Sequence, residues 1–234
     1  MKLKKIASLV LAGVMAVSML TACGEGNTID EKPNQPEEPT TPSGYSEVLY
    51  KHLSTTAQKK VTASDSDAVN NALLAAMEFM SNGEIGNFYD HGWADSVKLV
   101  NEYNYPAAPQ ALKNAAKDLI DSLAAENTLS QGIDHAIDGA LDPTKENYNK
   151  TDRNVALLFV TDGGKGADAV MDEVASMINA GIESLQDDYN TTLNNGDYVH
   201  TDYDYTISVG AYTKTLTNDH GKSMTFVAVN IARV

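Results

Sequence analysis

Two segments in the second half of the chain are apolar on both faces of a β-strand, and this limits the fold more than any other feature. Val155–Val160 contains no polar side chain. In Ser223–Val234 the neighbours Phe226 and Val227, which must point to opposite faces, are both apolar. A strand buried on both faces needs helices above and below it. The sequence therefore predicts an α/β fold of three layers, an α/β/α sandwich with the helices first.

The first half of the body has the spacing of apolar side chains, three to four residues apart, that predicts helices. Ser64 or Ser66 can cap the first helix, and Thr128–Gln131 has the pattern of a capping box for the third. Gly83–Pro106 is rich in Gly, Asn and Asp and predicts a loop with at most one short helix. The apolar stripes run through Val69–Met80, Leu112–Leu123 and Ile133–Leu141.

The second half predicts a β-α-β-β tail. A strand over Val155–Val160 leads through a glycine-rich break into the clearest helix, Ala167–Leu185. Asp187–Asp197 is interpreted as a polar turn region. Tyr203–Tyr212 and Ser223–Val234 then predict two strands that form a closing antiparallel hairpin.

The first 23 residues resemble a bacterial lipoprotein signal. Three lysines precede the apolar run Ile6–Leu20, which has the length of a signal peptide and is short for a membrane span. The run ends in Leu20-Thr21-Ala22-Cys23, which is similar to the lipobox, where cysteine follows Leu, a small residue and Ala or Gly. The alternative is an ordinary cleaved signal with a chance cysteine.

The resemblance implies that Cys23 becomes the first residue of the mature protein and carries a diacylglycerol on its sulfur. A thiolate is a strong nucleophile for this attachment, and a further acyl chain such as palmitate makes the anchor stable. The protein is then held by lipid on the extracytoplasmic face of the cell membrane. Because Cys23 is the only cysteine, no intrachain disulfide can form.

The sequence divides into three parts. Residues 1–22 are the signal peptide, 23–45 the lipid anchor and linker, and 46–234 a single globular domain. The linker holds four of the seven prolines and one large apolar side chain, Ile29. Such a composition predicts a disordered or polyproline spacer between membrane and domain.

The charge of the mature chain excludes whole classes of partner. The signal peptide carries three lysines and no acid, so its removal leaves 14 basic and 32 acidic residues and a formal charge of −18. Nucleic-acid binding depends on cations that neutralise phosphates, so no nucleic-acid partner is expected. Anionic lipid headgroups are disfavoured in the same way. Neutral or cationic partners remain open.

Local signatures of catalysis are missing from the sequence. The five histidines form neither H-x-x-x-H nor H-E-x-x-H, and no G-x-S-x-G elbow occurs. Gly164-x-Gly166-x-x-Ala169 is placed as a dinucleotide fingerprint would be, but Asp168 beside it would repel a pyrophosphate. We therefore predict no cofactor and no metal site.

His91 and Trp93 are candidate ligand-binding residues because aromatic side chains surround them in the sequence, and His135 is a third candidate. Trp and Tyr combine flat apolar area with a polar edge, which suits a sugar or peptide groove. Packing of the same side chains in the core is the alternative. The aromatic residues concerned are Phe88, Tyr89, Tyr103, Tyr105, Tyr198, Tyr203 and Tyr205.

The body from residue 64 onward resembles the CAP domain, or SCP-like family. Tyr205–Gly210 and Phe226–Asn230 look like its closing hairpin, and Asn154-Val155-Ala156 is similar to its Glu-Asn-Ile-Ala strand. The resemblance implies an α/β/α sandwich, secretion and a cleft of two His and two Glu. Arg153 stands where the first Glu is expected, and only His135 can take the place of the first cleft histidine.

Two functions follow as expectations. The first is a lipid-anchored, non-catalytic surface module that binds an extracellular ligand or protein. The second is a hydrolase or metal-dependent enzyme, such as a degenerate CAP-like protein, that acts on cell-wall or other extracellular polymer. Histidines gathered with a carboxylate in one pocket would favour the enzyme.

Replacing the lipid-bearing residue tests the anchor directly. We expect Cys23→Ala to move the protein out of the membrane fraction, because no acyl chain can then be attached to the sulfur. Fractionation and mass spectrometry of the native protein measure this. Retention of Cys23→Ala in membranes, or an unmodified thiol in the native protein, would show that the lipobox interpretation is wrong.

Overall fold

The structure is a computed structural model of the whole chain, and it describes residues 44–78, 80–90, 92–102, 108–142, 153–192, 196–215 and 222–234. Cys23, the signal peptide and the predicted linker up to residue 43 lie outside these ranges.

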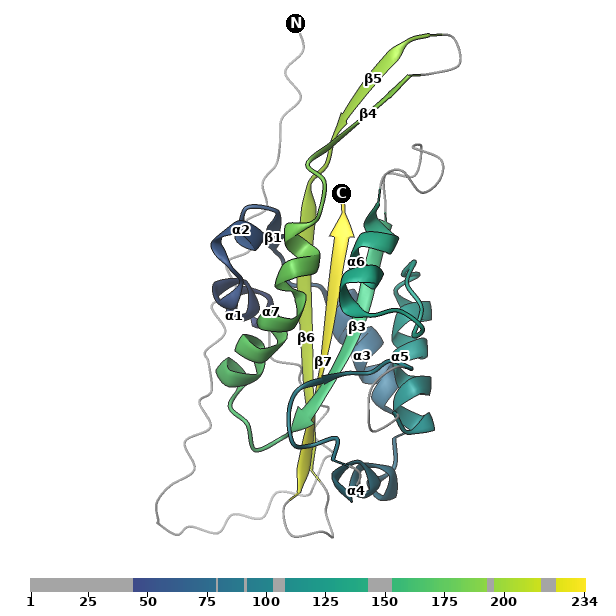
Figure 1. The fold of residues 1–234 in the computed structure, drawn as a ribbon. Coiled ribbons are helices and arrows are strands. Elements are labelled where there is room, and N and C mark those ends of the chain that lie inside the picture. The colour runs from purple at the N-terminus through teal and green to yellow at the C-terminus, as the bar shows by residue number, and fades with distance from the viewer. Residues whose placement is uncertain are drawn as a thin grey trace, which may run out of the picture. The chain divides into compact units, whose positions relative to one another are not determined.

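A five-stranded mixed sheet forms the middle layer of the described body, in the order β1-β6-β7-β3-β2 (Figure 1). Only β1 and β6 run parallel, and the other neighbours are antiparallel. The strands are β1 (Val61–Ala63), β2 (Lys98–Leu99), β3 (Arg153–Asp162), β6 (Tyr205–Thr215) and β7 (Ser223–Arg233).

Helices cover both faces of this sheet. On one face α1, α2, α6 and α7 share a core cluster with the strands, and on the other α3 and α5 share a second cluster with them. The short helix α4 adds Phe88 to that second cluster. The helices are α1 (Tyr45–His52), α2 (Thr55–Gln58), α3 (Asp67–Glu78), α4 (Asn82–Asp90), α5 (Gln110–Ser122), α6 (Ile133–Leu141) and α7 (Ala167–Glu183).

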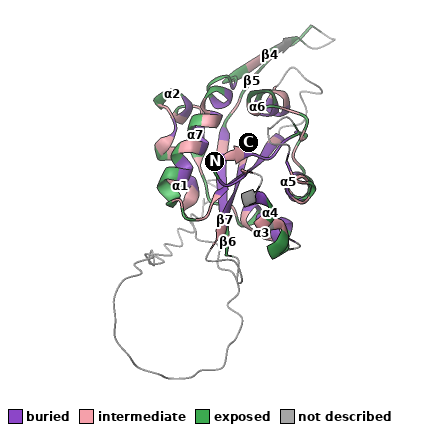
Figure 2. Ribbon diagram, turned by 60° about the horizontal axis from the view of Figure 1, so that its bottom comes forward, coloured by how far each residue is buried: buried purple, intermediate pink, exposed green. Residues whose placement is uncertain are grey.

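The alternation of side chains along the long strands explains the three layers. In β3, Leu157 and Phe159 enter the first core while Leu158 and Val160 enter the second, and β7 divides its apolar residues in the same way. Figure 2 shows the buried strands between the helices. The predicted α/β/α class and the closing antiparallel hairpin are therefore confirmed, as is the helix that follows the glycine-rich break.

Two local predictions are wrong. The third helix begins at Ile133, not at Thr128. The amide of Thr128 does donate the expected hydrogen bond to Gln131 Oε1, at 2.8 Å, but this bond closes a turn that precedes the helix. Asp187–Asp197 is not a plain turn region, because Asp188–Thr192 forms a strand, β4.

The one short helix allowed within Gly83–Pro106 is present as α4, whereas the sequence interpretation missed the strands β1 and β2. A capping box at Ser81 and Glu84 starts α4: Glu84 Oε2 accepts the Ser81 amide at 2.7 Å, and Ser81 Oγ accepts the Glu84 amide at 3.3 Å. The strands β1 and β2 are too short to give a periodic signal. Their positions come from pairing with β6 and β3.

The outer edges of the main sheet are hydrogen-bonded beyond these short strands. At the edge of β3, the Asn127 side-chain amide bonds both the carbonyl (2.8 Å) and the amide (2.9 Å) of Ala156, as a neighbouring strand would. At the other edge, Ser46 Oγ accepts the Val209 amide at 2.9 Å just beyond β1. Free strand edges recruit other chains, so such side chains protect the body from edge-to-edge pairing.

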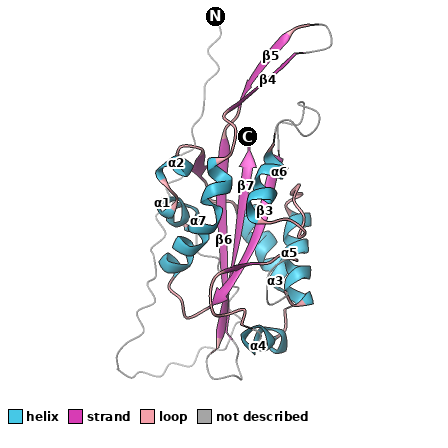
Figure 3. Cartoon of the chain, viewed as in Figure 1, coloured by secondary structure: helices cyan, strands magenta, loops and turns pink. Residues whose placement is uncertain are grey.

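A second, two-stranded sheet stands apart from the main one. It consists of β4 (Asp188–Thr192) and β5 (Tyr198–Asp202), which pair with each other antiparallel, and we call these two strands the arm. Figure 3 shows them beyond the N-terminal end of β6. The Tyr203 amide closes the base of the arm on the Asp187 carbonyl at 2.8 Å. Among the described residues, none from the arm joins either core cluster.

Substitution of Gly163 tests how closely the end of β3 packs against the start of β7. A Cβ there would lie 2.7 Å from Ser223 Cβ and 2.8 Å from the Ser223 backbone carbon. We expect Gly163→Ala to lower the free energy of unfolding by about 1–3 kcal/mol, because the start of β7 must move. Urea denaturation measures it. Gly83→Ala in α4, where the nearest atom is 4.0 Å away, is the control and should be neutral or slightly stabilising.

Candidate functional site

The three predicted ligand-binding residues do not form one site in the described structure. Trp93 is 0% exposed and belongs to the core cluster beneath α3 and α5. His135 is exposed on α6, which covers the opposite face of the sheet. His91 lies outside the described residues. Trp93 therefore offers no surface to a ligand in this conformation, and the structure does not bring it together with His135.

The predicted aromatic groove divides between core and surface. Phe88 and Tyr205 are buried in the core, and Tyr203 is half-buried with the Arg233 guanidinium 4.5 Å above its ring. Burial raises the pKa of Tyr205 to about 12, and its hydroxyl donates to the Gln186 carbonyl at 2.8 Å. Tyr198 is exposed at 67% and is the only large exposed side chain among the members of this set whose side chains the structure describes; Tyr103 and Tyr105 lie outside the described residues. The core-packing alternative is thus confirmed for Phe88, Trp93 and Tyr205.

His52 forms the closest contact between a histidine and two carboxylates in the described chain. Its Nε2 lies 2.9 Å from Asp168 Oδ1, and its Nδ1 lies 3.3 Å from Asp172 Oδ1. The hydrogen bond to Asp168 and the charges of both aspartates raise the pKa of His52. Both aspartates are strongly exposed on α7 and line none of the three pockets described below, so the contact fastens α1 to α7.

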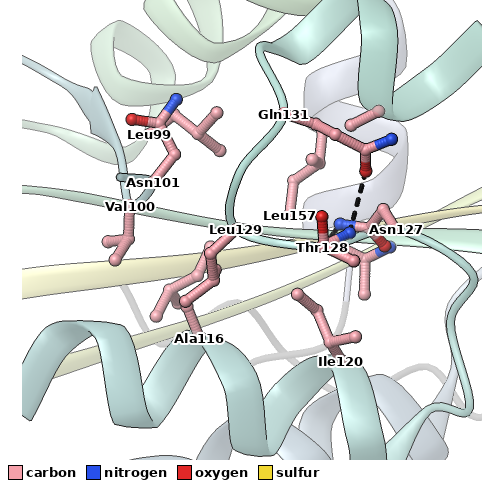
Figure 4. Close-up of a pocket in the computed structure, with 13 residues that line it drawn as sticks. Leu99, Val100, Asn101, Ala116, Ile120, Asn127, Thr128, Leu129, Gln131 and Leu157 are labelled. Carbon is pink, nitrogen blue, oxygen red and sulfur yellow. Dashed lines mark hydrogen bonds between the residues drawn. The ribbon is translucent and has the colours of Figure 1, made fainter. Parts of the chain in front are cut away.

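A small pocket lies between α5, the 127–131 segment and β3 (Figure 4). Its volume is about 10 Å³, which is the room that one water molecule needs. Buried Asn127, whose side chain bonds Ala156, and the Thr128–Gln131 bond lie at its wall. This pocket fits a structural water and is too small for a substrate.

Two larger hollows flank α3. One, of about 170 Å³, lies between α3, α4 and α5 and is lined by alanines with Glu84 and Asp118. The other, of about 410 Å³, lies between α3 and β6, where Glu78 and Lys214 supply the charge. Lys214 donates to the Met80 carbonyl. Neither hollow is lined by a described histidine, so no nucleophile and base are paired there.

The turn between β3 and α7 is closed by the protein's own acidic groups. The Gly164 amide donates to Asp162 Oδ1, which occupies a donor that a bound phosphate would need. Glu173 accepts from Lys165 Nζ at 2.7 Å and from the Val97 amide at 3.1 Å, and these bonds lower the pKa of Glu173. The turn therefore anchors the segment before β2 and does not present an anion site.

Neither a metal site nor a membrane span is found in the part of the chain that the structure describes. No group of three or more His, Cys, Asp or Glu side chains in this part is arranged to hold a metal ion. None of its helices combines the length and the apolar composition needed to cross a bilayer.

The arm presents the most distinctive exposed surface among the described residues. The register places Asp188 opposite Asp202, Asn190 opposite His200 and Thr192 opposite Tyr198, and all six are exposed. His200 bridges this face, with Nδ1 2.6 Å from Asn190 Oδ1 and Nε2 2.9 Å from Asp202 Oδ1. Like charges directly opposite each other weaken a strand pair, so the Asp188–Asp202 pair does not serve stability.

The arm is also the surface that sequence reasoning missed. Its strands are short and mostly polar, and Val199 is their only aliphatic residue, so no apolar period marks them. A run of Thr, Tyr and Val on both sides of a glycine was the available signal for a hairpin.

Comparison with protein-family models, with curated proteins and with solved structures finds no match to this chain. The lipobox and CAP-domain resemblances therefore rest on the residues quoted for them and remain predictions.

The His52 contact predicts a pH dependence of stability. The pKa of His52 is raised in the folded state above the unfolded value of about 6.5. The stabilisation is therefore complete below that pH and is lost as the pH rises through the folded pKa. Relative to His52→Gln, the wild type should gain more stability at about pH 5.5 than at about pH 8.5, by less than about 1 kcal/mol.

Urea unfolding at both pH values measures this difference. His135→Gln is the matched control, since it removes an exposed histidine that has no carboxylate within ion-pair distance among the described residues. Equal stability differences at the two pH values for His52→Gln would show that the ion pairs contribute nothing.

Proposed function

We propose that this chain is a lipid-anchored, non-catalytic binding module that contacts an extracellular partner through the arm. The single observation that carries the proposal is a pair of strands held outside both cores, with Tyr198 exposed at 67%. Within the described residues the only other large hydrophobic side chain so exposed is Val234, at the chain end.

The energetics of the arm support a contact role. Fixing each backbone residue costs about 1–2 kcal/mol of conformational entropy. Isolated two-stranded hairpins are at best marginally stable in water. The ten paired residues of β4 and β5 receive no stabilisation from either core, so their order does not follow from folding needs alone. Exposed Tyr is enriched where proteins meet, because it offers contact area at low entropic cost.

The base of the arm is firmly attached, as recognition requires. Lys60, which directly precedes β1, bonds both the Leu185 carbonyl and Asp187 Oδ1 at 2.8 Å through its Nζ, and these bonds fasten the segment between α7 and β4 to the body. At the first residue of β6, which follows the arm in the chain, the Tyr205 hydroxyl donates to the Gln186 carbonyl. A rigid base limits the entropy that a partner must remove on binding.

The anchor and spacer predicted from the sequence fit this role. A lipid on Cys23 and a proline-rich linker would hold the acidic domain outside the cell and clear of the bilayer. The partner is then a molecule of the extracellular space or the cell surface, of neutral or positive charge.

A CAP-like enzyme is the second candidate, favoured by the α/β/α layers and the closing hairpin that the resemblance implies. Its cleft would need carboxylates near His135. Arg153, at the position of the family's first Glu, is 6% exposed and its guanidinium donates to the Ala140 carbonyl at 3.4 Å. That position therefore supplies a buried cation in place of an acid.

Site-specific photo-crosslinking in intact producing cells tests the binding role. A photoreactive phenylalanine at position 198 of the full-length protein should give a discrete adduct, because Tyr198 lies in the proposed contact. The same group at Lys117, whose side chain is 66% exposed on α5, is the matched control and should give none. Adducts of equal yield from both positions, or none from 198, would contradict the proposal.

A further inference from the structure

The edges of the arm differ from the edges of the main sheet. The body protects its outer strands with Asn127 and Ser46 and with short strands. In the arm, β4 and β5 pair only with each other, so each has one edge with no neighbouring strand among the described residues. Natural proteins guard such edges with Lys, Pro or bulges, and residues 188–202 contain neither Lys nor Pro. An open edge of this kind accepts an extended peptide as an added strand.

The charge around the arm selects the kind of peptide. Five aspartates and no Lys or Arg occur from residue 187 to 204. The β4 side carries Asp187 and Asp188, and Lys60 pairs the first of these at 2.8 Å. The β5 side carries Asp197, Asp202 and Asp204, and Asp202 Oδ1 lies 2.9 Å from His200 Nε2. Positive side chains on an added strand would meet this acidity at close range.

Tyr198 adds an apolar contact on the same strand. It lies on β5 on the face that holds His200 and Asp202, since successive residues two apart share a face. A phenol ring beside carboxylates can hold the aliphatic stem and the charge of Lys or Arg.

We propose that the free edge of β5 binds an extended, cationic polypeptide segment as a third strand of the arm. This rests on the proposed function and specifies its partner. Main-chain hydrogen bonds to β5 hold the segment, while Asp202, Asp204 and Tyr198 favour Lys or Arg on its outward face. A second copy of this chain is the disfavoured occupant, since each mature copy carries a formal charge of −18 and two acidic arms would repel each other.

Synthetic peptides test the proposal on the purified mature protein. The first probe is a labelled ten-residue peptide of alternating Lys and Thr, and the second replaces every Lys with Glu. Two further probes keep the Lys–Thr sequence but are N-methylated on alternate residues, one at the Lys and one at the Thr positions. Fluorescence anisotropy at low and at physiological salt measures binding.

Strand addition predicts an asymmetric result. An edge strand uses the amides of alternate residues only, so one N-methylated isomer should bind about tenfold more weakly than the parent while the other stays close to it. The Glu peptide should not bind. Equal binding by both isomers and the parent would mean that charge alone attracts the peptide, and this would overturn the proposal.

Paired charge variants locate the site. Asp202→Asn with Asp204→Asn should weaken binding of the Lys–Thr peptide about fivefold, because two attractive charges are lost. Asp118→Asn with Asp138→Asn removes two exposed aspartates from α5 and α6 and should change nothing. Equal loss in both double variants would contradict a site on β5.

The outcomes separate this inference from the proposed function. An adduct at position 198 in cells together with no binding of the Lys–Thr peptide would reject the cationic strand and leave the binding module intact. Absence of the adduct rejects the proposed function itself. Sedimentation of the mature protein as an arm-dependent dimer would identify a second copy as the occupant and overturn the proposal.

Discussion

The pairing of β7 with both β3 and β6 is the interaction on which the rest of the body depends. Each pair is antiparallel and continuous over its strand, from Arg153 opposite Arg233 to Asp162 opposite Met224 on one side. Because the side chains of β7 alternate between two cores, a shift of one residue would exchange their contents. The helices above and below can pack only when this register is correct, so the sheet and its two cores specify each other.

Under the proposed function, the chain uses its body for stability and its arm for recognition. Its body satisfies the outer strand edges with side chains such as Asn127 and fastens α1 to α7 through His52, so little of the protected surface invites another chain. The arm differs: it has exposed side chains, strand edges with no neighbouring strand among the described residues, and Asp188 opposite Asp202. Binding residues commonly sit on such projections because the scaffold fixes them without depending on them. Changes in the arm can therefore alter affinity with little cost to the fold.

The sequence predicts the helices and strands whose apolar side chains are buried, and it predicts few of the elements that lie on the surface. The spacing of apolar residues predicts two strands and one helix that the structure contains. These are the strands at Val155–Val160 and from Phe226 onward, and the helix α7. Ser81–Glu84 and Thr128–Gln131 carry the same capping pattern, yet only the first starts a helix, because residues after 128 form a turn against β3. From the sequence, Trp93 is a candidate ligand-binding residue because aromatic residues lie near it. Only the tertiary structure shows that its side chain is buried. The arm has no apolar period, so its strands are invisible to that test.

The proposed interaction divides affinity and selectivity between two kinds of force. Charge acts over roughly 10 Å at physiological salt and raises the encounter rate, but it does not distinguish a folded basic surface from an extended one. Main-chain pairing along β5 makes that distinction, because only a segment with free amides and carbonyls can join the edge. In a folded protein most backbone amides and carbonyls already form hydrogen bonds within its own structure. The chemistry of the proposed site therefore favours flexible, Lys- or Arg-bearing chains, and the predicted lipid tether would keep the arm where such chains are exposed.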